Sequence, residues 1–221
     1  MLKIAVFDSG YGGENFADQL EQELPIVDVI RIIDWRHAEE IQSSPKSARR
    51  CAENALRSYI GKVDLIIFAN HLLSVTSLKY FKRKYKNQRF LGLTLELPCS
   101  FIRKDILILT TKAITKTISY RQLLFQLKSF RVKTLILESW PLKIDDGELK
   151  LPEITNVLNT KVLKDNFRPA DVIIACSQFN DIIPEIKKVL GEKIKIYDGR
   201  RDVFSDIYKT LRIRGGAGKK K

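Results

Sequence analysis

The sequence predicts an α/β protein of two pseudo-symmetric halves, each a mostly parallel sheet flanked by helices. Short, mostly continuous apolar runs recur along the 221 residues, and such runs are typical of strands covered on both faces. Longer helical patterns separate these runs, which indicates parallel βαβ units. Two of the runs end on similar phrases, IIFANH at Ile66–His71 and IIACSQ at Ile173–Gln178. This echo indicates that the arrangement is repeated in the second half.

Eight strands and seven helices are expected in order along the chain. The predicted strands are Lys3–Phe7, Val27–Ile33, Leu65–Phe68, Phe90–Leu93, Asp105–Thr110, Lys133–Leu137, Val172–Ala175 and Ile194–Tyr197. The predicted helices are Asn15–Glu23, Pro45–Tyr59, Leu73–Tyr85, Thr115–Phe130, Pro152–Lys164, Ile182–Leu190 and Val203–Leu211. Local signals support these bounds: Ser44 is a favoured cap, Pro45 suits a first helical position, and Gly61 suits a helix end.

The halves are expected to meet near Leu95–Ile102. This boundary gives an N-terminal half at residues 1–95 and a C-terminal half at 96–199. The last helix, at 200–212, is expected to pack back on the N-terminal half. The Gly/Lys-rich end, 213–221, is expected to be disordered because it has too little apolar surface to fold.

Composition excludes several classes of protein. Hydrophobic residues make up 44% of the chain and charged residues 29%, which is ordinary for a globular domain. No run approaches the roughly 18 apolar residues of a membrane helix, and the first residues do not form a signal peptide. We therefore expect a cytoplasmic protein with no membrane partner.

Cysteine and histidine usage argues against a metal site. The three cysteines, Cys51, Cys99 and Cys176, lie far apart and form no CxxC pair. Only two histidines are present, His37 and His71. Neither a disulfide framework nor a zinc site is indicated.

The net charge of +13 is the one unusual compositional value, and it favours attraction to nucleic acid or other anionic surfaces. Cations concentrate in the segment Lys79–Arg89, where aromatic residues interleave with them. The cations are Lys79, Lys82, Arg83, Lys84, Lys86 and Arg89. A solvated helix face is the simpler interpretation, and a phosphate-binding ridge is the alternative.

Candidate site residues follow the predicted strands, because ligands of parallel sheets bind beyond the carboxyl ends of the strands. The first loop offers Asp8, Ser9 and Gly10, and its glycines allow close approach to a ligand. Later loops offer Asn70, His71, Thr111 and Ser177. Cys176 also ends a predicted strand, where a lowered pKa would make it a thiolate base or nucleophile, although an inert buried cysteine fits equally well.

Taken in this order, these loops resemble those of the glutamate racemase family, within the aspartate/glutamate racemase superfamily. IAVFDSGYGG resembles the opening strand and DSGxGG loop of the family, and IIACSQF at Ile173–Phe179 resembles its second catalytic phrase. The resemblance implies two α/β halves with the active site between them and a cofactor-free reaction. One cysteine removes the α-proton and the other delivers a proton to the opposite face. It implies that Asp8 assists the first cysteine and that Cys176 is the second.

Three positions depart from the family pattern. Ala69 stands where the first catalytic cysteine is expected, and Gln178 stands where a histidine follows the second. The carboxylate-binding P-Y-G phrase expected after Asp34 has no equivalent.

Three interpretations remain open. The protein could be a racemase homologue that has lost racemisation and binds a small amino acid, a carboxylate or a macromolecule. It could be a one-cysteine decarboxylase or isomerase, similar to the arylmalonate decarboxylases. It could also be an active glutamate or aspartate racemase in which His71 or water acts beside Cys176. A homodimer is compatible with each.

Overall fold

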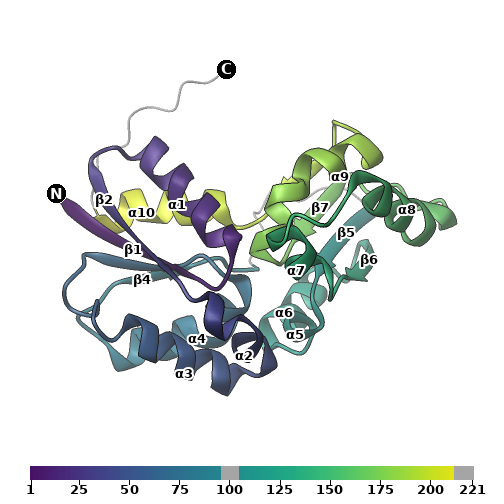
Figure 1. Ribbon diagram of the computed structural model, residues 1–221. Helices are drawn as coiled ribbons and strands as arrows, with labels where there is room; N and C mark the ends of the chain where they lie inside the picture. Colours follow the sequence, from purple (N-terminus) through teal and green to yellow (C-terminus); the bar gives the residue numbers. More distant parts are fainter. Residues whose placement is uncertain (96–104, 212–221) are drawn as a thin grey trace.

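The computed structural model describes residues 1–95 and 105–211, which form two four-stranded parallel sheets that lie side by side (Figure 1). Most of the predicted boundary at Leu95–Ile102 lies outside the described residues. Cys99 and the predicted tail at 213–221 lie wholly outside them.

The N-terminal half is built on the sheet ordered β2-β1-β3-β4. Its strands are β1 (Leu2–Asp8), β2 (Val27–Ile33), β3 (Leu65–Phe68) and β4 (Phe90–Gly92). Two helices cover one face, α1 (Tyr11–Glu23) and α10 (Arg200–Leu211). Three cover the other, α2 (Ala38–Ser43), α3 (Pro45–Leu56) and α4 (His71–Lys84).

The C-terminal half repeats this plan with the sheet order β6-β5-β7-β8. Its strands are β5 (Asp105–Thr110), β6 (Arg131–Ile136), β7 (Asp171–Ile174) and β8 (Lys195–Tyr197). One face is covered by α7 (Trp140–Asp145), α8 (Leu151–Lys161), α9 (Ile183–Leu190) and the 3-10 helices η2 (Leu163–Asp165) and η3 (Ser177–Ile182). The other is covered by α5 (Lys112–Thr115) and α6 (Ile118–Gln126). The predicted pair of parallel α/β halves is therefore confirmed.

Beyond shifts of a few residues at element ends, two differences from the predicted elements stand out among the described residues. The helix expected at Thr115–Phe130 is broken, because Thr117 caps α6 by accepting a hydrogen bond from the Tyr120 amide (3.2 Å). In addition, α7 and the segment comprising η1 (Trp35–His37) and α2 are helical where no element was expected. These helices are too short to show a helical period in the sequence.

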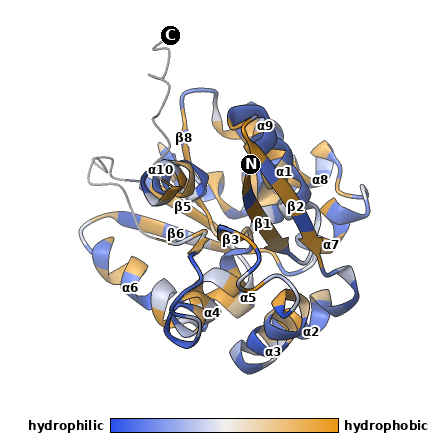
Figure 2. Ribbon diagram, turned by 90° about the vertical axis from the view of Figure 1, so that its left-hand side faces the viewer, coloured by the Kyte–Doolittle hydropathy of each residue, from blue (hydrophilic) through white to orange (hydrophobic). Residues whose placement is uncertain are grey.

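Apolar side chains of the strands and of the inner helix faces form the core, as the orange strands between bluer helices show in Figure 2. The last helix, α10, packs in the N-terminal core, where the Phe204 ring stacks on Phe16 with centroids 5.3 Å apart. The chain therefore returns to its first half at its end.

The segments that join the halves touch each other. A Cβ on Gly199, which has a φ of +76°, would lie 3.0 Å from the carbonyl oxygen of Thr94. This close approach and the left-handed backbone together require glycine. Within the described residues, no helix combines the length and apolar character needed to cross a bilayer.

Candidate functional site

The candidate site lies between the halves, where the carboxyl ends of β1, β3 and β7 come together. Five of the predicted residues, Asn70, His71, Thr111, Cys176 and Ser177, line one cavity of about 20 Å³. That volume accommodates about one water molecule. The remaining lining residues are Gln42, Leu72, Ile114, Ala175 and Gln178.

Asp8 is fully buried at the end of β1, beside this cavity's wall. Its Oδ1 accepts hydrogen bonds from the Ser9 amide (2.6 Å) and from Asn70 Nδ2 (2.8 Å), while Oδ2 has no partner among the described residues. Burial raises the pKa of Asp8 to about 7, and the Asn70 and Ser9 hydrogen bonds limit that increase. The carboxyl group is therefore poised to exchange a proton near neutral pH.

The glycines of the first loop allow the two halves to approach each other. A Cβ on Gly10 would lie 2.6 Å from Gln178 Nε2, and one on Gly12 would lie 2.6 Å from the Cβ of Ser177. The sequence predicted close approach to a ligand at this loop. In the structure, the groups that approach it are protein side chains of η3.

Asn70 has a structural role as well as its contact with Asp8. It caps α4, since its Oδ1 accepts a hydrogen bond from the Leu73 amide (3.0 Å). Its side-chain amide is thereby fixed toward Asp8. The preceding residue, Ala69, is fully buried at the end of β3. Its methyl group cannot transfer a proton.

His71 is held as a neutral ring. Burial lowers the pKa of His71 to about 3. Its Nε2 lies 3.1 Å from the carbonyl oxygen of Asp198, so the proton belongs on Nε2, which donates. The other nitrogen, Nδ1, is buried and has no partner in the described chain. At neutral pH this imidazole does not carry a second proton.

Cys176 is half-buried and is held as a thiol. Burial raises the pKa of Cys176 well above its usual range, and the nearby Asp8 and Asp145 carboxyls add to the increase. Its Sγ donates a hydrogen bond to Gln178 Oε1 over 3.1 Å. The sequence allowed a lowered pKa at this strand end, but the pKa of Cys176 is raised here, because burial disfavours the thiolate and the neighbouring carboxyls add to that effect.

Asp145, on α7, is a site residue that the predicted list lacked. Its Oδ1 accepts from the Tyr11 amide of the N-terminal half (3.2 Å), and its Oδ2 accepts from Gln178 Nε2 (3.4 Å). Burial raises the pKa of Asp145 to about 6. Because α7 is too short to show a periodic pattern, no helical signal marked Asp145 in the sequence.

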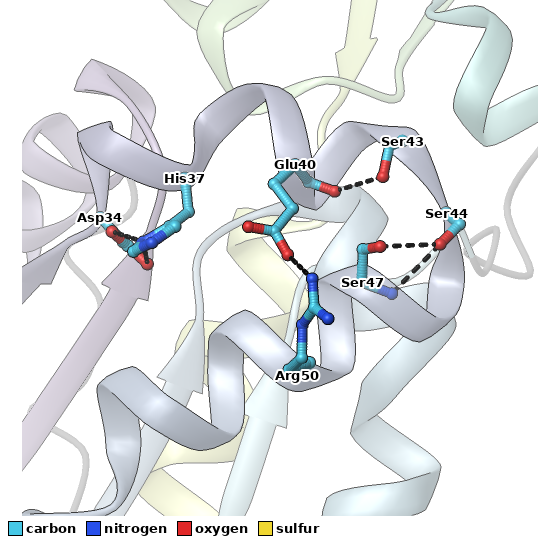
Figure 3. Close-up of polar contacts among 7 residues, drawn as sticks. All are labelled: Asp34, His37, Glu40, Ser43, Ser44, Ser47 and Arg50. Carbon is cyan, nitrogen blue, oxygen red and sulfur yellow. Dashed lines mark hydrogen bonds and ion pairs between the residues drawn. The ribbon is translucent and has the colours of Figure 1, made fainter.

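The segment after Asp34 is ordered by contacts within itself (Figure 3). His37 Nδ1 donates to Asp34 Oδ1 (2.8 Å), and Arg50 of α3 pairs with Glu40 of α2. Gln42 is the residue of this segment that lines the cavity. The segment therefore contributes one side chain to the cavity wall, and Gln42 is a second residue missing from the prediction.

The basic cluster lies at the end of α4 and in the turn after it. Its six cations are all exposed, and Lys84 is paired with Glu53. Phe81 is fully buried beneath them. Aromatic side chains thus face inward and cations face solvent, and none of the six lines the cavity.

No group of three or more His, Cys, Asp or Glu side chains within the described residues is arranged to hold a metal ion. The chemistry that the geometry offers is proton transfer by Asp8, Asp145 and Cys176, and hydrogen bonding by Asn70 and Thr111.

Known proteins resemble the chain over nearly its whole length, although no protein-family model matches it. The glutamate racemase of Clostridium perfringens strain SM101 is 23% identical over 214 residues, which cover 94% of this chain and 82% of that enzyme. The glutamate racemase of Aliarcobacter butzleri is also 23% identical, over 88% of this chain and 78% of its own length.

Solved structures of racemases share the fold. Glutamate racemase from Campylobacter jejuni superposes with a TM-score of 0.80 at 21% identity, covering 100% of this chain and 89% of that one. The Escherichia coli enzyme, solved with L-glutamate and the activator UDP-MurNAc-Ala, gives 0.81 at 16% identity, covering 98% and 84%. Aspartate racemase from Picrophilus torridus gives 0.62 at 16% identity, covering 97% and 95%.

Proposed function

Because the chain is a divergent member of the glutamate racemase family, we propose that it binds a small amino acid or related carboxylate between its halves without racemising it. The observation that carries the proposal is the methyl group of Ala69 at the end of β3. Inverting a stereocentre needs an acid and a base on opposite sides of one carbon. Cys176 supplies a proton carrier from the C-terminal half, and Ala69 supplies none from the other.

In the arrangement observed, His71, Gln178 and Asp8 do not take over the missing role. The pKa of His71, lowered to about 3 by burial, keeps its ring neutral, and its one N–H is donated to a backbone carbonyl. Gln178 has no titratable group. Asp8 has a pKa near neutrality, but it is fully buried and does not line the cavity.

The cavity retains groups suited to a carboxylate ligand. Asn70, Thr111 and Ser177 line it with an amide and two hydroxyls. Its volume of about 20 Å³ requires the halves to separate before an amino acid enters. Two hydrogen bonds across the halves would then break, from the Tyr11 amide to Asp145 and from Asn15 Nδ2 to Asp181 Oδ1 (2.5 Å).

Calorimetric titration with L-glutamate and L-aspartate tests the binding step. Thr111→Val removes a hydroxyl from the cavity while keeping the side-chain shape, and should weaken binding about tenfold through loss of one hydrogen bond to a charged group. The matched control is Thr160→Val on the exposed face of α8, which should bind like the parent. Absence of saturable binding to the parent protein would overturn the proposal.

One observation favours a second candidate function, single-face protonation by one thiol. Cys176 is held as a thiol at neutral pH, with its proton directed at Gln178 Oε1. Decarboxylation of a malonate breaks a carbon–carbon bond and leaves a carbanion, whose electron pair could take the Sγ proton. Such a reaction needs one proton carrier, as the arylmalonate decarboxylases do.

Release of carbon dioxide from a panel of substituted malonates separates the two candidates. If the protein only binds its ligand, carbon dioxide should be released at the uncatalysed rate. Release that is faster than this rate and is abolished in Cys176→Ala protein would establish the second function in its place.

A further inference from the structure

A second cavity, of about 300 Å³, lies between α1, α10 and the start of α9, outside the residues that line the Cys176 site. It draws on both halves, since α1 and α10 belong to the N-terminal core and η3 and α9 to the C-terminal core. It is lined by Gln19, Glu23, Asn180, Ile183, Asp198, Arg200, Arg201 and Phe204. Its size lies at the lower end of the range for small-molecule sites.

Arg200 is the unusual residue of this cavity. Its side chain is 14% exposed, yet its buried Nε and Nη2 have no hydrogen-bond partner among the described residues. The closest ion pair joins Nε to Asp198 Oδ2 over 3.7 Å, which is too long for a hydrogen bond. Asp181, whose charge also acts on Arg200, accepts a hydrogen bond from Asn15 and not from Arg200. A buried guanidinium without acceptors is costly, and native structures rarely leave one unsatisfied.

The rest of the lining defines the chemistry of an acceptor. Arg200 and Arg201 contribute two positive charges, and Glu23 and Asp198 contribute two negative ones. Such a balanced lining suits a ligand with one charge of each sign better than a dianion. The planar fork of an arginine matches a carboxylate, and nearby carboxylates match an ammonium group.

Amide groups complete the cavity. Gln19 lines it from α1, and Asn180 lines it from η3 with an Oδ1 that has no partner among described residues. We propose that this cavity is a second ligand site, which binds a free α-amino acid with its carboxylate on Arg200 and its ammonium toward Glu23 and Asp198.

The cavity is linked to the Cys176 site through η3. Asn180 Nδ2 donates to the carbonyl oxygen of Ser177 over 3.0 Å, and Ser177 lines the first cavity. A ligand held by Arg200 on α10 and by Asn180 on η3 would bridge the two halves. Its binding is therefore expected to favour the closed arrangement and to slow ligand entry at the Cys176 site.

Nitrogen-15 NMR of the whole protein tests the proposal without a variant that might misfold. Glycine and L-glutamate, at concentrations on the order of 10 mM, should shift the Arg200 Nε–H and the Gln19 and Asn180 side-chain amide signals saturably. Acetate should bind more weakly because it lacks the ammonium group, and inorganic phosphate should not compete. Equal binding of acetate and glycine, preferential binding of phosphate, or no shift with any probe would each overturn the proposal.

Variants then assign the site. Arg200→Lys keeps the charge beside Asp198 but removes the fork, and should weaken glycine binding about tenfold. The control, Arg36→Lys on the exposed segment after β2, should leave it unchanged. Thr111→Val should leave the glycine-induced shift of the Arg200 Nε–H signal unchanged, because Thr111 lines the Cys176 cavity and not this one. Each site can therefore be disproved separately. Equal affinity in Arg200→Lys and parent protein would contradict the assignment.

Discussion

Replacing Asp8 by asparagine should stabilise the protein increasingly as the pH rises. Burial raises the pKa of Asp8 from 3.8 to about 7. At a pH between these two values, the folded state therefore still holds the Asp8 proton, whereas the unfolded state has lost it. Each pKa unit corresponds to about 1.4 kcal/mol, so ionising the buried carboxyl costs the folded protein about 4 kcal/mol above neutral pH. Below about pH 4 this cost disappears, because both states are protonated.

The amide of Asp8→Asn cannot ionise, so the variant avoids that cost at every pH. Its Oδ1 can keep the hydrogen bonds from Ser9 and Asn70. Its NH₂ group replaces an oxygen without a partner, which costs about 1–3 kcal/mol independently of pH. The difference in free energy of unfolding between variant and parent should therefore grow by about 2–3 kcal/mol from about pH 5 to about pH 8.

Urea unfolding of both proteins at several pH values measures this difference. The neutral His71 contributes a pH dependence of its own, which is present in both proteins and cancels. Asp28→Asn, at an exposed residue of β2, is the matched control and should show no growing difference. Parallel stability curves for Asp8→Asn and parent would refute the reasoning that burial controls this carboxyl.

Two further predictions concern Cys176 and the basic cluster. Because burial keeps Cys176 as a thiol, iodoacetamide should alkylate it at neutral pH at least about tenfold more slowly than free cysteine, as followed by mass spectrometry. Alkylation at the rate of free cysteine would show a thiolate. The exposed cations of α4 predict salt-sensitive retention on RNA, and neutralising Lys82 and Arg83 with glutamine should reduce the salt slope by about 1.4. Retention that is absent at moderate salt would exclude the cluster as an RNA-binding surface. Retention that is unchanged in this variant, but reduced by neutralising Lys187 and Lys188 on α9, would exclude it as well.

Buried strands were the elements most fully predictable from the sequence. The bounds of Leu65–Phe68 and Asp105–Thr110 agree with the structure, because apolar runs between polar residues mark strands covered on both faces. The helix expected at Thr115–Phe130 failed at Thr117, whose hydroxyl starts a new helix. The sequence does not show that a hydroxyl inside an apolar pattern caps a helix, because that role depends on which amide it contacts.

The site was predictable as far as it depends on strand ends. Asn70, Thr111 and Cys176 each follow a strand, and parallel strands carry such residues to one edge. Asp145 and Gln42 were missed because they lie on short helices without periodicity. The state of His71 was also beyond the sequence, since its neutral ring results from burial by residues distant along the chain.

Formation of D-glutamate tests the central claim most directly. L-glutamate incubated with the protein should give no D-glutamate by chiral chromatography, because Ala69 leaves one face of the ligand without an acid or base. D-glutamate that accumulates with the parent protein, and not with Cys176→Ala protein, would contradict the claim and show that a second proton carrier acts beside Cys176.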